Sequence, residues 1–398
     1  MRILQRISLV RYYYMTFKIG VIGAGGRGTL AKHAHRPDDG IRVTACCDLD
    51  PVILDQCRDW YGQEVLTTRD WREVLAAGVD AVVIATPDWL HEEHAVAALE
   101  QGLAVYLEKP MAITIAGCDR ILRTAKQHQA RLFVGHNMRY MTIIRKMKQL
   151  IDAGAIGKVK TIWCRHFISY GGDAYFRDWH ADRECSTGLL LQKGAHDLDV
   201  MHWLADSYSR RVTAFGSLAV YGDLPRRTDP AIDKKDTSTW WNQAHWPPKA
   251  LTGFNPVMDV EDQNLMLMQM ENGVLGAYLQ CHFAPDCCRN YTVIGDAGRL
   301  ENIGDGPDDP IFVWNKRQDG YRTVGDAVFR GDPVDASSGH GGADAVIMRE
   351  FVEFARHGGP TTATPEAARM SVAAGCQATA SLRAGGVPLE VPAIDWEG

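Results

Sequence analysis

The sequence contains no run of about 18 apolar residues, and this lack excludes a membrane-spanning helix. It also lacks a block of Lys and Arg residues, and its formal net charge of -6 is small, so nucleic acid is not an expected partner. The 10 cysteines include no CxxC pair and no Cys/His spacing suited to zinc, so no metal site is expected. We therefore predict reduced thiols and a cytoplasmic protein.

What the chain does have is length and apolar content. With 398 residues, 46% of them hydrophobic, two domains are expected. Residues 1–14 precede a conventional start at Met15, and arginines interrupt their apolar stretch without a small-residue cleavage site. We interpret residues 1–14 as an N-terminal extension and not as a secretion signal.

Residues 15–137 alternate between short apolar runs and helical patterns. A buried-strand pattern covers residues 17–22, and a helical pattern continues to about His35. Further strands are expected within 41–50, 79–87, 102–110 and 131–137, with a helix at 91–102. This alternation predicts an α/β domain of the Rossmann type, with a doubly wound parallel sheet.

The pattern changes after residue 137, and residues 138–398 are expected to form a second domain. Long alternating strands joined by ENG and GDAG turns are typical of an antiparallel or mixed sheet. Strands are expected at 158–169, 210–222, 261–271, 273–283, 290–295 and 387–392, and helices at about 141–153, 343–357 and 365–384. Residues 223–258 lack periodicity, and we interpret them as a long excursion near the active site.

A glycine-rich turn follows the first strand and fits the pattern GxGxxG. In such a turn glycines allow a tight bend, close approach of a diphosphate and close packing of helix on strand, while the helix N-terminus attracts phosphate. The residues expected at the cofactor here are Gly23, Gly25, Gly26, Arg27 and Gly28.

Asp48 ends the second predicted strand, 20 residues after Gly28. A carboxylate at this place accepts hydrogen bonds from the adenosine ribose and repels a 2′-phosphate, so the cofactor expected is NAD and not NADP. The alternative is that Asp48 only caps the turn before Pro51.

Two further strand ends lie on the same side of the predicted sheet, where ligands of open α/β sheets bind. Thr86 and Pro87 are expected to line the cofactor, together with His91, which could instead be a helix-start residue without a ligand. Glu108 and Lys109 end the other strand and are also expected at the cofactor. A lysine there can donate to a substrate oxygen and exchange its proton, unless it is an ordinary surface lysine.

These segments resemble the glucose-fructose oxidoreductase, inositol dehydrogenase and MocA (Gfo/Idh/MocA) family. The resemblance rests on GVIGAGGRG, CDLDP, ATPDWLHEEHAVAALEQG, LEKPMA, VGHNMRY and IDAGAIGKV. It implies a Rossmann domain followed by an α+β domain with a large open, mostly antiparallel sheet that often makes oligomer contacts. It also implies hydride exchange between a nicotinamide and a sugar or polyol carbon, with Lys109 as the family lysine and Asn137 near the nicotinamide.

Residues 187–199 resemble a second family segment, GGxLxDxGxHDxD. His196 matches the family histidine and is expected to accept the alcohol proton, although it could be a satisfied polar residue of the core. Gln192 stands where many members have an aspartate, and a glutamine cannot accept a proton near neutral pH. The base therefore stays open between His196, Lys109 and an unplaced residue, while Lys193 could compensate by contacting a substrate oxygen or an anionic group.

The segment 175–183, YFRDWHADR, is rich in groups that bind carbohydrates. Aromatic faces stack on sugars while charged and polar groups bond their hydroxyls, although loop aromatics are also often plain packing. The substrate residues expected here are Tyr175, Arg177, Trp179 and His180. His340 and Asp344 resemble a family turn of the substrate domain, but Asp344 would suit helix capping equally well.

Together these patterns predict an NAD-dependent dehydrogenase acting on a small carbohydrate, assembled as a homodimer or homotetramer. One alternative is an enzyme of the same fold that retains NAD and cleaves a glycosidic bond through transient sugar oxidation. A second alternative is a non-catalytic nicotinamide-binding sensor, which could have lost Lys109 and His196.

Overall fold

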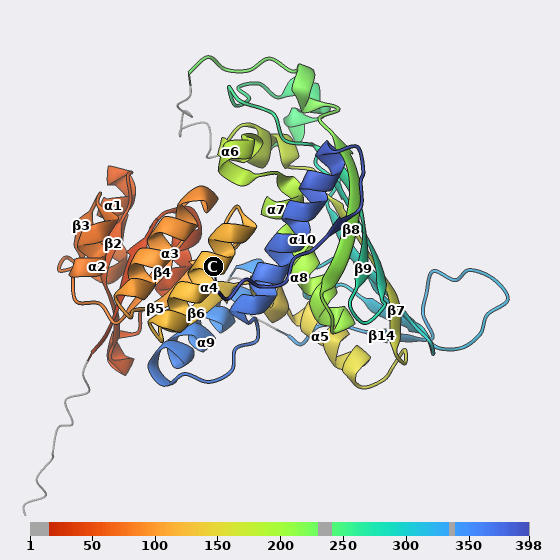
Figure 1. Cartoon of the computed structure of the whole chain (residues 1–398), viewed down its shortest axis with the longest axis horizontal. Helices are drawn as coiled ribbons and strands as arrows, with labels where there is room; N and C mark the ends of the chain where they lie inside the picture. Colours follow the sequence, from red (N-terminus) through yellow and green to blue (C-terminus); the bar gives the residue numbers. More distant parts are fainter. Residues whose placement is uncertain (1–15, 230–240, 334–338, 398) are drawn as a thin grey trace, which may run out of the picture.

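The computed structural model describes residues 16–229, 241–333 and 339–397. The predicted extension at residues 1–14 and the middle of the predicted excursion, residues 230–240, therefore lie outside the described residues. Figure 1 shows two large sheets, with α10 (Pro365–Arg383) between them.

The first sheet is parallel throughout and has six strands within the described residues. Its order is β3-β2-β1-β4-β5-β6, the doubly wound order expected of a dinucleotide-binding sheet. The strands are β1 (Phe17–Ile22), β2 (Ile41–Cys47), β3 (Leu66–Thr68), β4 (Ala81–Ile84), β5 (Ala104–Glu108) and β6 (Leu132–Gly135). The prediction of a Rossmann-type parallel sheet is confirmed.

Helices connect these strands. They are α1 (Pro51–Tyr61), α2 (Trp71–Ala76), α3 (His91–Glu100) and α4 (Ile115–Gln127), with 3₁₀ turns η3 (Asp88–Leu90) and η4 (Asn137–Tyr140). The helix predicted to reach about His35 is instead a 3₁₀ helix, η1 (Gly26–His33). Gly26, with φ +49°, and Gly28 lie in its first turn, and glycine disfavours regular helix.

The second sheet is mixed and mostly antiparallel, in the order β14-β13-β12-β11-β7-β10-β9-β8-β15 across the described chain. Its one parallel pair joins β7 and β10. The strands are β7 (Val159–Phe167), β8 (Ser209–Ser217), β9 (Gln263–Met270), β10 (Leu275–Cys281), β11 (Cys288–Gly295), β12 (Arg299–Asn302), β13 (Ile311–Trp314), β14 (Ala327–Phe329) and β15 (Leu389–Glu390). The predicted open sheet is confirmed, and β12 to β14 extend it beyond the strands expected from the sequence.

This half of the chain contains both short and long helices. The short ones are a π-helical turn η5 (Gly172–Phe176), η6 (Trp179–Ala181), α6 (Arg183–Ser186) and α7 (Leu189–Gln192), and the longer helices are α5 (Thr142–Asp152), α8 (Gly194–Ala205), α9 (Ala343–His357) and α10 (Pro365–Arg383). Searched across the described residues, no helix is both long and apolar enough to cross a membrane.

The last two helices return to the first sheet. Phe351 of α9 packs edge-on against Tyr106 and Phe133, in the core that also holds Leu30 and Cys57. On the opposite face, Ala368 and Val372 of α10 join the core formed with α2, α3 and α4. Helices α9 and α10 therefore cover the two opposite faces of the first sheet. They also bring the last part of the chain close to the ends of the strands of that sheet.

Candidate active site

The glycine-rich turn between β1 and η1 has room for backbone alone at two positions. A Cβ added to Gly28 would lie 1.9 Å from the Gly23 carbonyl oxygen, and one added to Gly23, where φ is +80°, would lie 2.8 Å from the Ala85 carbonyl oxygen. The turn thus forms the cradle that a diphosphate needs. The residues present fit a bound dinucleotide.

Asp48 points from the end of β2 toward this turn. Its Oδ2 accepts a hydrogen bond from the Gly25 N–H at 2.9 Å, and its Oδ1 accepts one from the Asp50 N–H at 2.9 Å. Asp48 therefore stabilises the turn before Pro51, as expected from the alternative in which it caps this turn. It also contacts the glycine-rich turn expected to bind the nucleotide. Its contact with a ribose stays a prediction.

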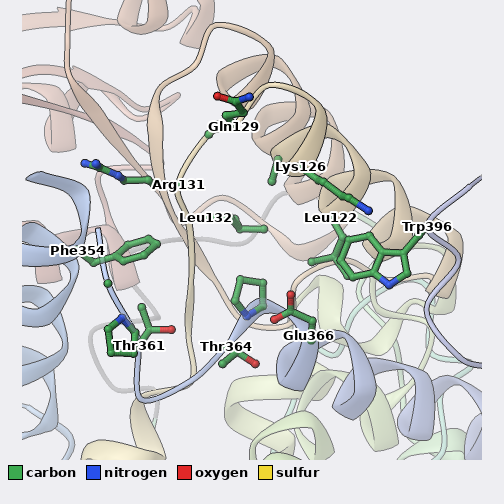
Figure 2. A pocket seen from close by; sticks show the side chains of 15 residues that line it. Leu122, Lys126, Gln129, Arg131, Leu132, Phe354, Thr361, Thr364, Glu366 and Trp396 are labelled. Carbon is green, nitrogen blue, oxygen red and sulfur yellow. The ribbon is translucent and has the colours of Figure 1, made fainter. Parts of the chain in front are cut away.

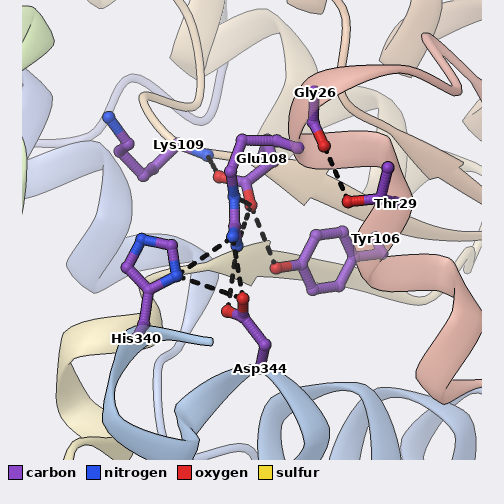
Figure 3. Close-up of polar contacts among 8 residues, drawn as sticks. Gly26, Thr29, Tyr106, Glu108, Lys109, His340 and Asp344 are labelled. Atoms are coloured by element: carbon purple, nitrogen blue, oxygen red, sulfur yellow. Dashed lines mark hydrogen bonds and ion pairs between the residues drawn. The ribbon is translucent and has the colours of Figure 1, made fainter. Parts of the chain in front are cut away.

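Arg27 connects the glycine-rich turn to both halves of the chain (Figure 3). Its guanidinium donates to Glu108 at 2.9 and 3.0 Å and to Asp344 at 3.0 and 3.2 Å. Burial alone would raise the pKa of Glu108 and of Asp344, but the hydrogen bonds and charges around them, above all those of Arg27 for Glu108 and of His340 and Arg27 for Asp344, hold both values below their usual range.

Asp344 is not the cap residue of α9, because Gly342 occupies the cap position and Asp344 lies within the first turn. Its carboxylate is directed at Arg27 and at His340 Nδ1, which is 3.1 Å away. The capping alternative is therefore wrong for Asp344. The prediction that Arg27 binds the cofactor stays a prediction, with its guanidinium shared between two carboxylates.

His91 begins α3, and both of its ring nitrogens face backbone carbonyls. Nδ1 lies 2.7 Å from the Pro110 oxygen and Nε2 lies 2.8 Å from the Thr86 oxygen. The buried ring thus ties together the loops after β4 and β5. This arrangement favours a positioning role for His91, while Thr86 and Pro87 lie at the strand end where a cofactor was expected.

Lys109 follows β5 and reaches the second half of the chain. Its Nζ donates to the backbone oxygen of Gln192 at 3.3 Å. Burial lowers the pKa of Lys109 to about 8, and the charge of Lys193 adds to this effect while Asp88 opposes it. The structure therefore brings together Lys109, Gln192 and Lys193 as the sequence predicted, and Lys109 is not an ordinary surface lysine.

His180 and His196 lie around the same lysines. Burial lowers the pKa of His180 to about 3 and that of His196 well below its usual value, and the charges of Lys109 and Lys193 add to both effects. Nδ1 of each ring is buried without a hydrogen-bond partner among the described residues. His196 is thus a neutral imidazole with an uncommitted nitrogen, and it is not a satisfied core residue.

A cavity of about 330 Å³ opens beside these groups. Its lining includes Asn137, Tyr170, Lys193, His196 and Arg289. Asn137 is 2% exposed, and its Oδ1 is an unused acceptor in the described part of the chain. The Lys193 Nζ lies 3.3 Å from the Tyr170 hydroxyl and 5.6 Å from the centre of its ring.

The aromatic segment divides between this site and its surroundings. Trp179 stacks on His180 with ring centres 3.7 Å apart, and its edge meets Trp89 from the first half of the chain at 5.1 Å. The ring of Tyr175 lies 5.7 Å from the Lys193 Nζ. Arg177, by contrast, lies beside Gly253 of the predicted excursion, where a Cβ would be 3.5 Å from its guanidinium.

Sequence reasoning missed three groups at the site. Tyr170 and Arg289 line the cavity, and Arg289 forms ion pairs at 3.0 Å with Asp197 and with Asp305. Asp88 is buried near Lys109, and burial raises its pKa to about 7 although Lys109 and Gln192 lower it. Only Asp88 had a signal, because it belongs to the ATPDWLH motif that was singled out.

A larger hollow than this cavity lies elsewhere (Figure 2). It has a volume of about 560 Å³ and lies among α4, the start of β6 and the α9–α10 connection, with Trp396 at its rim. This is the amino end of β6, whereas Lys109 follows the carboxyl end of β5. Within the described ranges, no group of three or more His, Cys, Asp or Glu side chains is arranged to hold a metal ion.

Comparison with known proteins assigns the family. The Gfo/Idh/MocA model described as "Oxidoreductase family, NAD-binding Rossmann fold" matches residues 17–136, and that of its "C-terminal alpha/beta domain" matches residues 148–391. The chain therefore belongs to the Gfo/Idh/MocA oxidoreductase family. Its first sheet is an NAD-binding Rossmann fold, so the recognition and the cofactor predicted from the sequence are confirmed.

Individual relatives agree with this assignment. Bacillus subtilis YteT, named as an oxidoreductase, is 25% identical over 78% of this chain and 81% of its own length. Inositol 2-dehydrogenase of Ralstonia nicotianae is 34% identical over 49% of this chain, and the match spans only 56% of that enzyme. The crystal structure of myo-inositol 2-dehydrogenase from Lactobacillus plantarum shares the fold, with a TM-score of 0.69, 20% identity and coverage of 94% of this chain and 99% of that one.

Proposed function

We propose that the protein is an NAD-dependent dehydrogenase that transfers a hydride between the nicotinamide and a secondary hydroxyl of a sugar, sugar acid or polyol. The observation that carries this proposal is that His196 and Lys193 line the 330 Å³ cavity, while Lys109, at the carboxyl end of β5, lies close enough for its charge to act on His196. The inositol dehydrogenases among its relatives support the substrate class.

The glycine-rich turn and Asp48 would hold the dinucleotide, with Thr86, Pro87 and Asn137 toward its nicotinamide. Bound NAD would supply the hydride acceptor. The chain itself supplies the proton acceptor, either the amine of Lys109 or the neutral ring of His196.

The other cavity groups orient the substrate. Lys193, the Tyr170 hydroxyl and the Asn137 amide offer donors and acceptors to hydroxyl groups. The rings of Tyr175, Trp179 and His180 pack against one another, with Tyr175 beside Lys193, and do not line the cavity. Their contact with the apolar face of a sugar stays a prediction. Fixing the reacting carbon in this way accounts for a large part of the rate that such enzymes achieve.

One observation favours a second candidate, a glycosidase that retains NAD. The site has Gln192 where the resembled family segment has a carboxylate, and Trp89 and Trp179 add aromatic surface beside the site. Such an enzyme oxidises a sugar only transiently, so that it releases an aglycone without accumulating NADH.

A single screen separates these candidates. Purified protein is incubated with NAD and with sugars, sugar acids, polyols and nitrophenyl glycosides, while NADH absorbance and aglycone release are recorded together. Steady NADH formation that Lys109→Met abolishes supports the dehydrogenase, and aglycone release without NADH supports the glycosidase. If the protein binds NAD but forms neither NADH nor aglycone, and if Lys109→Met binds NAD equally well, both enzyme candidates are contradicted. The remaining candidate is then the non-catalytic nicotinamide-binding sensor.

The outer face of the second sheet supports the proposed homodimer or homotetramer. Alternate residues of β9 face outward, and the exposed large apolar side chains of β7 to β10 are Trp163, Phe215, Leu265, Leu267 and Leu275. A face this apolar marks a protein contact. Light scattering should give a multiple of 44.1 kDa for the wild type and a monomer for Leu265→Asp/Leu267→Asp.

We further propose that residues 15–137 carry the cofactor, that residues 138–398 bind the carbohydrate, and that the protein works in the cytoplasm. All ten cysteines, each within the described residues, are free thiols, which supports a reducing compartment. Cell fractionation tests the location.

A further inference from the structure

A carboxylate near Lys109 has no role in the chemistry so far. Asp88 begins η3 after the end of β4, is 5% exposed, and its Oδ2 has no hydrogen-bond partner among the described residues. Gln192 hydrogen-bonds to this carboxyl, and Lys109 is the cation that acts on it most strongly. We propose that Asp88 is a positioning residue for Lys109, which orients the Lys109 side chain and supplies the negative charge that Gln192 cannot supply.

Local structure engages only part of this carboxylate. The cap position of η3 is Pro87, and Asp88, in the first turn, bonds to its own backbone N–H, which leaves Oδ2 unpaired among the described residues. Glu108, the other carboxylate near Lys109, is fully engaged, since Oε1 accepts from Arg27 and Oε2 accepts from the Lys109 N–H. Burying a carboxylate oxygen without a hydrogen-bond partner lowers the stability of the folded protein. The presence of such a carboxylate beside a functional lysine therefore indicates a functional role.

The surroundings of Lys109 leave Asp88 as its principal counter-charge. The charged and titratable groups acting on or acted on by Lys109 are Arg27, Asp88, His91, Glu108, His136, His180, Lys193 and His196. Of the two carboxylates, Asp88 raises the pKa of Lys109 more than Glu108 does. Lys193 and Arg27 act in the opposite direction, so removal of Asp88 leaves Lys109 among cations.

The catalytic purpose of this role rests on the proposed dehydrogenase function. The electrostatic effect of Asp88 on Lys109 does not depend on that function. When Lys109 as a neutral amine takes the substrate hydroxyl proton, it becomes an ammonium, and the oxygen keeps the electron pair that forms the carbonyl as hydride leaves the carbon. The Asp88 carboxylate stabilises that ammonium without itself bonding to substrate. The same carboxylate keeps the Lys109 side chain directed into the site.

The first experiment needs no cofactor or substrate. Lysines of the cofactor-free protein are reductively ¹³C-methylated, and the Lys109 signal, assigned with Lys109→Arg, is titrated by NMR. In Asp88→Asn the pKa of Lys109 should fall by about one unit, because a nearby anion favours the ammonium. The exposed Asp38→Asn should leave it unchanged. An unchanged Lys109 pKa in folded Asp88→Asn overturns the proposal.

Moving the carboxylate gives a second, independent readout. The acidic limb of the kcat/KM pH profile should shift to lower pH in Asp88→Asn, with activity down about tenfold or more, and Asp88→Asn/Gln192→Asp should recover most of both. A double variant no better than the single one contradicts the proposal. If Asp88→Asn does not fold, Gln192→Glu alone must raise the Lys109 pKa, and an unchanged value refutes it. If no substrate is turned over, the proposed function fails while the NMR titration still decides the role of Asp88.

Discussion

Glu108 and Lys109 are neighbours in the chain, yet they belong to two clusters that differ in how well opposite charges are paired. Around Glu108, Arg27 contacts two carboxylates at distances of 3.2 Å or less. Around Lys109, the two ammonium groups contact neutral oxygens at 3.3 Å, the Gln192 carbonyl and the Tyr170 hydroxyl. Figure 3 shows the Lys109 ammonium directed away from the carboxylate cluster.

The difference separates a structural cluster from a functional one. A compensated cluster stabilises the fold when both partners are present and penalises the loss of either. In a cluster with too few counter-charges, like charges repel one another, and a bound substrate or transition state can reduce this repulsion. Such clusters are typical of active sites. The comparison predicts that substitutions around Glu108 affect stability, and that substitutions around Lys109 affect turnover.

The largest effect is expected for Lys109→Met. Loss of the proton-transferring amine should lower kcat by about 10² to 10⁴, with little loss of thermal stability because no ion-pair contact is broken. Initial rates and melting curves of the same preparation measure both. Lys160→Met, at an exposed lysine, is the control. A large stability loss with kcat retained would reverse the assignment of the two clusters.

Arg27→Met should have the opposite profile. It leaves Glu108 buried without its cation, and removing one partner of such a pair costs about 3 kcal/mol of unfolding free energy. Urea unfolding at pH 7 measures this loss, and Arg72→Met, whose ion pairs are exposed, should lose less than about 1 kcal/mol.

The Arg27 effect should also depend on pH with a definite sign. The pKa values of Glu108 and Asp344 are lowered in the folded protein, so their stabilisation is fully present above the unfolded values of about 4 and is lost as pH falls through the folded ones. The difference between wild type and Arg27→Met should therefore shrink below about pH 4. A constant difference down to pH 3 would mean that Arg27 acts through packing.

Lys193→Met should change binding more than chemistry. We expect KM to rise about tenfold, equivalent to about 1.4 kcal/mol, with kcat changed less than about threefold. Since Lys193 lowers the pKa of Lys109, the variant should also raise that pKa. Full kinetics at several pH values test both parts, and an unchanged KM would place Lys193 outside the substrate site.

The smallest effect is expected for the stability of Asp88→Asn. The pKa of Asp88 is about 7 in the folded protein, above the unfolded value of about 3.9. Ionisation of this carboxyl therefore lowers the free energy of unfolding as the pH rises between these two values. Asp88→Asn should therefore melt a few degrees higher than wild type at pH 8, with no gain at pH 4. A lower melting temperature at pH 8 would make Asp88 a stabilising residue.

The nucleotide end of the site could be predicted from the sequence because it is local. Gly23 to Gly28 and Asp48 are fixed by consecutive residues and by one strand, and strand periodicity placed them at the same sheet edge. Lys109 was found from its place at the end of a predicted strand, His196 and Lys193 were found through a family motif, and the structure brings the three together. How far burial lowers the pKa of Lys109 and of His196 could not be read from the sequence, and neither could the raised pKa of Lys193, because these shifts depend on the surroundings that the fold creates.

The remaining groups come from contacts that no local pattern encodes. Arg289 reaches the cavity because β11 pairs with β7, and Asp344 meets Arg27 because α9 returns to the first sheet. The capping alternative for Asp344 failed for the same reason, since a long-range ion pair took the side chain. Arg177 fits a sugar-binding pattern, yet the structure places it against Gly253.

The return of α9 and α10 has a consequence for biosynthesis. The strands of the first sheet are made within the first third of the chain, but Phe351 and Val372, which pack on its opposite faces, are made near the end. On the ribosome, the nascent sheet therefore waits with apolar surface uncovered for most of translation. Nascent chains stalled before residue 343 should bind chaperones that full-length chains release.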